Sequence, residues 1–160
     1  MKKIDITTKI EKYDNISELP EQEQQLINLA REAAEKSYSP YSKFKVGVAL
    51  LLSNDKIVTG NNQENAAYPS GLCAERTAIY YANAQYPDAA ILKMAVSATH
   101  QGLIIENPIS PCGACRQVMI ETETRFKTNI KTILDGEKAI YISKSAANLL
   151  PLSFTQSDLD

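Results

Sequence analysis

Apolar residues recur at helical intervals in three parts of the chain. Between residues 26 and 34 they follow Pro20 and two acidic side chains, which suit a first helical turn, and this pattern predicts a helix that ends before Ser39. Two more helices are predicted over 73–85, where several alanines favour helix, and over 111–123.

Between these helices the pattern changes to short apolar runs of strand length. A turn-forming segment at 53–55 separates the first two runs, so they are expected to form a β-hairpin. A short helix is expected over 145–150. Because strands alternate with helices, the chain is assigned to the α/β class, as one layered domain with helices covering a mostly parallel or mixed sheet. The expected strands are 46–52, 56–59, 92–98, 129–134 and 139–143.

The beginning of the chain has a different character. Residues 1–16 carry many charges and no helical period, and they predict an extended or loosely attached arm. Residues 17–160 are expected to form a single domain. A chain of 160 residues with 44% hydrophobic content can bury roughly two-thirds of its unfolded surface without disulfides.

Charge and hydropathy narrow the choice of partner. The formal net charge of −2 argues against an electrostatic grip on nucleic acid or on an anionic membrane, and favours a small uncharged ligand. No stretch approaches the ~20 apolar residues that a membrane span requires, so a cytoplasmic protein is expected. In a reducing compartment, an odd number of cysteines favours metal binding or catalysis over disulfides; the alternative is three buried thiols.

Two of the three cysteines lie three residues apart at the start of a predicted helix. On one helical face, Cys112 and Cys115 could hold one ion, and the helix N-terminus favours the thiolate that binds zinc. The same spacing occurs in thiol redox pairs, and by itself it does not decide between the two.

Cys73 favours the metal, because it begins another predicted helix and supplies a third soft ligand. Three protein ligands leave one position open, which is typical of catalytic zinc sites. His100, the only histidine, could close the site as a fourth ligand and make it structural, but its spacing and its loop context do not match a helix-borne ligand pair.

Charged residues next to these cysteines have candidate roles. Glu75 lies two residues after Cys73, where its carboxylate could reach a water on the ion as a general base; the alternative is an acid that stabilises the helix N-terminus. Three thiolates leave a zinc site with a net negative charge. Arg76, Arg116 and Gln117 could compensate by donating hydrogen bonds to sulfur, although solvated helix surface explains them equally.

The metal motifs resemble those of the cytidine deaminase family, in particular its small homotetrameric, three-cysteine branch. They are Cys73-Ala74-Glu75-Arg76 and Pro111-Cys112-Gly113-Ala114-Cys115-Arg116-Gln117, a signature known for zinc deaminases. Further similar blocks span roughly residues 22–155, but the 101–108 loop departs from the family pattern. The resemblance implies a three-layer α/β/α sandwich with a mixed, about five-stranded sheet.

The resemblance also implies an activity and a set of site residues. The activity is hydrolysis of cytidine and 2′-deoxycytidine to uridine and deoxyuridine plus ammonia, with one Zn²⁺ per subunit and Glu75 as proton shuttle. Asn62 and Glu64 would hold the ribose hydroxyls, Phe44 would pack against the nucleoside, and backbone groups near Ala74, Ser110 and Cys112 would orient the base. Phe154 would reach the site of a neighbouring subunit in a homotetramer.

Two alternative functions remain at this point. A sister deaminase could act on a modified cytosine nucleoside, as enzymes of the blasticidin S type do. A non-catalytic binding protein could use zinc for stability, but such a protein has no use for Glu75 beside an open metal position. The resemblance disfavours purine and nucleic-acid deaminases, because these generally have histidine at the position of Cys73.

Overall fold

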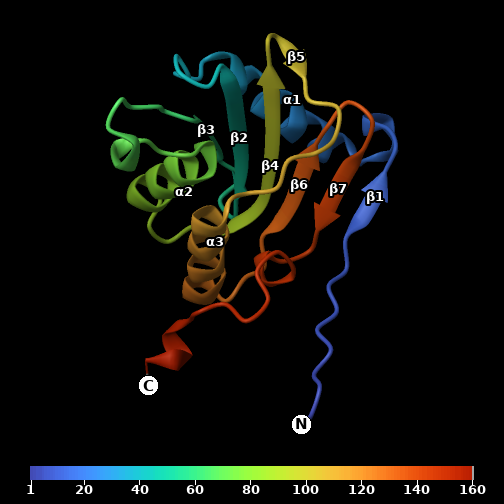
Figure 1. Ribbon diagram of the computed structural model, residues 1–160, viewed down its shortest axis with the longest axis vertical. Helices are drawn as coiled ribbons and strands as arrows, with labels where there is room; N and C mark the ends of the chain where they lie inside the picture. The colour runs from blue at the N-terminus through green and yellow to red at the C-terminus, as the bar shows by residue number, and fades with distance from the viewer. Residues whose placement is uncertain (160) are drawn as a thin grey trace.

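The computed structural model describes residues 1–159 and contains three α-helices and seven strands (Figure 1). The helices are α1 (Glu21–Glu35), α2 (Ala74–Gln85) and α3 (Gly113–Phe126). The strands are β1 (Glu11–Tyr13), β2 (Phe44–Leu52), β3 (Ile57–Asn61), β4 (Ile91–His100), β5 (Leu103–Ile104), β6 (Lys131–Asp135) and β7 (Ile140–Ser143).

All strands belong to one mixed sheet with the order β1-β7-β6-β4-β2-β3, and β5 also pairs with β4. The β4–β6 pair is parallel, and the other pairs are antiparallel. The five expected strands are all present. The sheet has seven strands because β1 and β5 add short edge pairs, too short to show a two-residue period in the sequence. The helix expected over 145–150 is a 3₁₀ turn, Ala146–Asn148.

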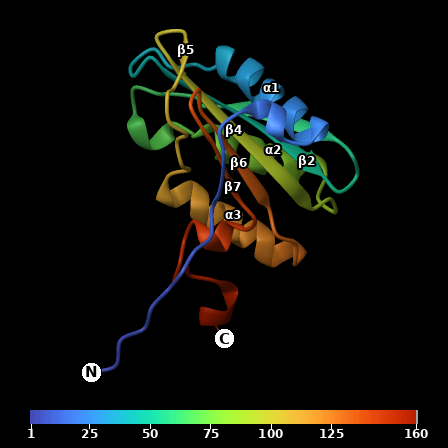
Figure 2. The same cartoon turned by 90° about the vertical axis from the view of Figure 1, so that its right-hand side faces the viewer.

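The two faces of the sheet carry different helices, which gives the expected three layers (Figure 2). Ala49 and Leu51 of β2 pack towards α1, whereas their neighbours Val48 and Leu50 pack towards α2 and α3. Because successive residues of a strand point to opposite faces, a nearly continuous apolar run is what a strand covered on both faces requires.

Two glycines bring the helices close to the sheet. A Cβ atom at Gly47 of β2 would overlap the backbone of Ala30 and Ala34 in α1. A Cβ at Gly60 of β3 would come within 2.7 Å of the backbone nitrogen of Ala78 in α2. These close approaches fix α1 and α2 against opposite faces of the sheet, with the start of α2 beside the polar loop that follows β3.

Within residues 1–159, none of the helices is long and apolar enough to cross a membrane. The segment predicted as an arm is extended over residues 1–10 and joins the sheet through β1, which pairs with β7.

Candidate active site and metal centre

The three cysteines meet where the N-termini of two helices converge. Cys73 is the N-cap residue of α2, Cys112 is the N-cap residue of α3, and Cys115 lies in the first turn of α3. The Sγ atoms of Cys73 and Cys112 are 3.8 Å apart, those of Cys112 and Cys115 are 3.4 Å apart, and all three lie within 4.8 Å of one another. Tetrahedral zinc with Zn–S bonds of ~2.3 Å separates its sulfurs by about 3.8 Å, so the cluster fits zinc.

No fourth protein ligand joins this cluster within the part of the chain that the structure describes. His100 is exposed at the end of β4, and its ring centroid lies 6.1 Å from that of Phe44. A site with three thiols and no fourth side chain leaves one coordination position for a small molecule, as in catalytic zinc centres.

The surroundings of Cys73 favour its thiolate. The pKa of Cys73 is lowered to about 5. The first cause is hydrogen bonding with the Cys115 thiol, and Arg76, whose Nη2 lies 3.7 Å from the Cys73 sulfur, also contributes. The same bond with Cys73, together with burial, raises the pKa of Cys115. Cys73 is therefore deprotonated more easily than Cys115, and Arg76 has the charge-compensating contact expected from the sequence.

Glu75 lies in the first turn of α2 and is only 5% exposed. Burial raises the pKa of its carboxyl group, and the negative charge of Cys73 acts in the same direction. None of the ion pairs among residues 1–159 includes Glu75. The charge of Arg76 lowers the pKa of Glu75 but does not outweigh burial. A buried carboxyl group with a raised pKa and no ion-pair partner is suited to accept and return protons.

Arg116 and Gln117 do not make the expected contacts with sulfur. Arg116 donates through Nε to the carbonyl of Pro111 and through Nη1 to the carbonyl of Leu149, both at 2.7 Å. Gln117 Nε2 donates to the carbonyl of Phe154 at 2.7 Å. Both side chains therefore fasten the C-terminal segment to α3 by binding backbone carbonyls at Leu149 and Phe154.

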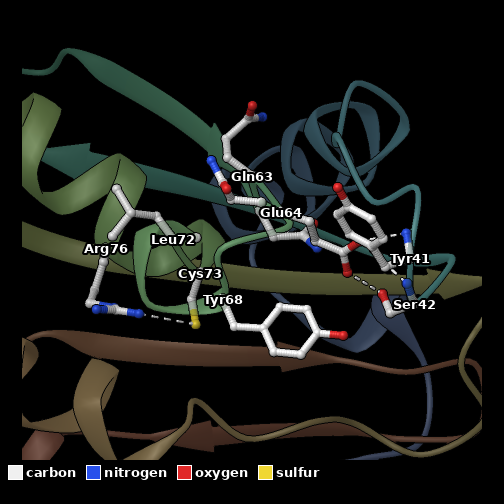
Figure 3. Close-up of a pocket in the computed structure, with 11 residues that line it drawn as sticks. Tyr41, Ser42, Gln63, Glu64, Tyr68, Leu72, Cys73 and Arg76 are labelled. Carbon is white, nitrogen blue, oxygen red and sulfur yellow. Dashed lines mark hydrogen bonds between the residues drawn. The ribbon is translucent and has the colours of Figure 1, made fainter.

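A cavity of about 520 Å³ opens in front of Cys73 (Figure 3). Cys73 and Arg76 lie at one end, and the carboxylate of Glu64 lies at the other, surrounded by Tyr41 and Ser42. The walls are mostly polar and aromatic, which suits a small ligand with hydroxyl groups and a ring. The lining residues are Tyr41, Ser42, Asn62, Gln63, Glu64, Asn65, Tyr68, Gly71, Leu72, Cys73 and Arg76.

Hydrogen bonds fix both predicted sugar-binding residues in this wall. Glu64 Oε2 accepts from the backbone nitrogens of Tyr41 and Ser42 at 2.9 and 3.3 Å, and Oε1 accepts from the Ser42 hydroxyl. The Ser42 hydroxyl bond is the first cause of the lowered pKa of Glu64. The Glu64 carboxylate is thus held in its charged form and keeps free lone pairs for ligand hydroxyls.

The side chain of Asn62 forms more hydrogen bonds within the protein than the sequence indicates. Its Oδ1 accepts from the Val46 nitrogen at 2.8 Å and from the Ser37 hydroxyl at 2.5 Å, and its Nδ2 donates to the Phe44 carbonyl at 2.9 Å. One amide hydrogen remains for a ligand. Asn62 therefore also ties the loop after β3 to the start of β2.

Comparisons with known proteins agree with this site. A family model described as "Cytidine and deoxycytidylate deaminase zinc-binding region" matches residues 20–129, which contain all three cysteines. The chain belongs to the cytidine deaminase family. It is 36% identical over 137 residues to a cytidine deaminase of Halalkalibacterium halodurans, covering 86% of this chain and 97% of that one. It is 39% identical over 140 residues to a cytidine deaminase of Sporosarcina psychrophila, covering 85% and 93%.

Solved structures show the same deaminase fold. The crystal structure of cytidine deaminase from Burkholderia pseudomallei has a TM-score of 0.69 and 39% identity, covering 85% of this chain and 100% of that one. Cytidine deaminase from Mycobacterium tuberculosis has a TM-score of 0.64 and 30% identity, covering 82% and 95%. The family, the layered fold and the three-cysteine zinc site expected from the sequence are thereby confirmed.

Four of the deaminase's predicted substrate residues lie off the cavity wall. Ala74 is buried as the first residue of α2, Phe44 is half-buried beside His100, and Ser110 and Phe154 are exposed. Conversely, the sequence did not single out Tyr41, Ser42 or Tyr68 as lining residues. The available signal was their position in polar segments next to β2 and α2.

Proposed function

We propose that this protein catalyses the hydrolytic deamination of cytidine and 2′-deoxycytidine to uridine and deoxyuridine, with release of ammonia. The observation that carries the proposal is the buried Glu75 carboxyl group beside a three-thiol metal centre. A metal site used only for stability gains nothing from a buried acid without an ion-pair partner, because its burial costs folding free energy.

Cys73, Cys112 and Cys115 would hold the metal. When bound, zinc lowers the pKa of a water molecule and makes it a nucleophile at neutral pH. Glu75 would accept a proton from the attacking water and deliver it to N3 of the pyrimidine. It would then accept the remaining proton of the new hydroxyl group at C4 and pass it to the departing amine. Its raised pKa supports both roles, because the group must bind and release protons in one cycle.

The opposite wall would recognise the sugar. Glu64 is fixed in its charged form and can accept hydrogen bonds from vicinal hydroxyls, and Asn62 can add one donor. Backbone groups near Ala74, Ser110 and Cys112 would orient the cytosine edge. The N-terminus of α2 supports this role, because the first N–H groups of a helix have no partner within it.

We further propose a homotetramer with shared sites. Phe154 is 58% exposed and Tyr68 is 79% exposed, which supports burial of these aromatic side chains against neighbouring subunits. Gln117 and Arg116 hold the segment that carries Phe154 in a defined position. The mass in solution at micromolar concentration tests the assembly, and a monomer would remove Phe154 from any site.

The three free thiols support a location in the reducing cytoplasm.

The activity is tested by the loss of cytidine absorbance, with zinc content measured on the same sample. Glu75→Gln should lower kcat by about 10²–10⁴-fold and keep the zinc, because the amide cannot shuttle protons. Glu32→Gln, an exposed exchange of the same kind on α1, is the matched control and should leave turnover unchanged. A zinc-loaded wild type that turns over a modified cytosine nucleoside but not cytidine would contradict the proposed substrate.

A further inference from the structure

The first ten residues form an extended arm that leaves the body of the molecule (Figures 1 and 2). Beyond the β1–β7 ladder, residues 1–10 make none of the hydrogen bonds found among residues 1–159. Three isoleucines on this arm are unusually exposed: Ile4 at 86%, Ile6 at 52% and Ile10 at 43%. The family match begins only at residue 20, so the arm lies outside the zinc-binding region.

The arm has the pattern of a strand that lacks a partner. Positions 4, 6, 8 and 10 are Ile, Ile, Thr and Ile, whereas positions 3, 5, 7, 9 and 11 are Lys, Asp, Thr, Lys and Glu. Apart from Thr8, this alternation gives an extended segment one apolar and one polar face. The segment runs directly into β1, which uses one edge for β7 and leaves its other edge open. An open strand edge is a template for pairing with another chain.

The sequence of the arm is complementary to itself when two copies run antiparallel around Thr7. Lys3 then lies opposite Glu11, and Asp5 lies opposite Lys9, each twice in the pair. On the other face, Ile4 lies opposite Ile10. Opposite charges and apolar residues that face each other across two strands stabilise their pairing.

Neighbouring registers lose this complementarity. Pairing centred on Ile6 places Lys3 opposite Lys9, and pairing centred on Thr8 places Asp5 opposite Glu11. Like charges directly opposite each other are destabilising, and a shift by a single residue would mix the apolar and polar faces. Parallel pairing in register would place each charge opposite its own kind.

We propose that the arm is an interaction surface for a second copy of this chain, and that the two arms pair antiparallel around Thr7. The pair is two-fold symmetric, and residues 1–3 of each copy run along the open β1 edge of the other. Glu11 already binds Lys144 with Oε1, and its second oxygen can accept from Lys3 of the second copy. Two-stranded pairs are marginal alone, so the contact with β1, which already belongs to a sheet, strengthens the pairing of the arms.

Cross-linking tests the register. In zinc-loaded full-length protein, Thr7→Cys places two cysteines opposite each other, and mild oxidation should yield a covalent dimer. Asp5→Cys is the matched control: its two cysteines would be separated by four residues along the strand, about 13 Å, which is beyond disulfide reach. Wild type, which keeps only its three metal-binding cysteines, gives the background.

We expect at least tenfold more covalent dimer from Thr7→Cys than from Asp5→Cys. Equal cross-linking of the two variants, or none from Thr7→Cys, would overturn the proposal and point to an arm that binds the body of another subunit or a different protein. The measurement uses no cytidine turnover, so its outcome is independent of the proposed activity.

Charge exchange tests the complementarity. In the Thr7→Cys background, Asp5→Lys places a positive charge opposite Lys9 and should reduce the cross-linked fraction roughly fivefold. Adding Lys9→Asp restores opposite charges and should restore cross-linking. A mixture of the doubly exchanged chain and the unexchanged chain should form mainly like-with-like dimers. No loss with Asp5→Lys, or random mixing, would contradict the charge pairing.

Discussion

Charged groups are buried on both faces of the sheet, but they are neutralised differently. On the face covered by α1, Asp135 is fully buried and accepts two hydrogen bonds from Arg31 at 2.8 Å and one from Ser97 at 2.8 Å. On the face covered by α2 and α3, Glu75 is buried and forms no ion pair among residues 1–159, and the charge of Arg76 does not offset its burial. Paired charges on the first face serve stability, whereas the acid on the second face has a raised pKa, which suits the proton transfer proposed for it.

Glu23 shows the same pairing on the α1 face. Its Oε1 accepts from Lys93 at 3.0 Å and from Lys131 at 2.6 Å. Burial alone would raise the pKa of Glu23, but the two lysine hydrogen bonds outweigh it, and the pKa lies below its ordinary value. The pKa of buried Glu23 is therefore lowered and that of buried Glu75 is raised. The difference is that lysines donate hydrogen bonds to Glu23, whereas Arg76 acts on Glu75 only through its charge.

The largest expected effect lies on the α2 and α3 face. Cys115→Ser removes a buried metal ligand, so zinc content should fall to background and turnover should fall by more than the roughly 10–100-fold that the loss of an outer contact costs. Metal analysis and cytidine turnover on one sample test this. Retention of zinc with full activity would show that Cys115 is a core thiol.

On the α1 face, Arg31→Met should destabilise the protein by about 3–5 kcal/mol, because it leaves the buried Asp135 without a counter-charge. Asp135→Asn is the matched change. Asp135→Asn should destabilise the protein less than Arg31→Met does, since the remaining Arg31 is partly exposed and can reach water. Urea unfolding of both variants measures the difference, and zinc content should be unchanged. Equal costs would show that the pairing does not decide the stability of this face.

Substitutions of the two arginines on the metal-binding helices should have different effects. Arg76→Gln removes the contact with Cys73 and should weaken zinc binding by about 10–100-fold with little loss of stability. Arg116→Gln removes two bonds to backbone carbonyls and should cost about 2 kcal/mol of stability. Chelator competition and urea unfolding, applied to both variants, distinguish these roles. Similar behaviour of the two variants would contradict the assignment.

The smallest effect concerns pH. Because the folded-state pKa of Glu23 is lowered, its contribution to stability is fully present above the ordinary glutamate pKa and is lost as the pH falls through the folded value. Glu23→Gln should cost about 1–2 kcal/mol at pH 7 and should flatten the acid side of the stability profile. Both proteins are compared with zinc bound, so that metal release contributes equally. If the stability of wild type and of Glu23→Gln changed with pH in the same way, Glu23 would not be a source of the pH dependence.

Local patterns were sufficient for much of the fold. The apolar run at 46–52 predicted the strand β2, and the predicted helix starts placed Cys73 and Cys112 at free helix N-termini. The short strands β1 and β5 could not be predicted, because two or three residues carry no period and depend on a neighbouring strand for their hydrogen bonds.

The sequence by itself determined the chemistry of the metal centre: three thiols, two of them three residues apart, and an acid two residues after the third. Only the tertiary structure decided the partners of the side chains around it. Arg116 binds the carbonyl of Leu149, 33 residues away, and the amide of Asn62 binds Ser37 and β2. Periodicity reports which face a residue occupies, whereas a hydrogen-bond partner depends on which distant segments the folded chain brings within about 3 Å.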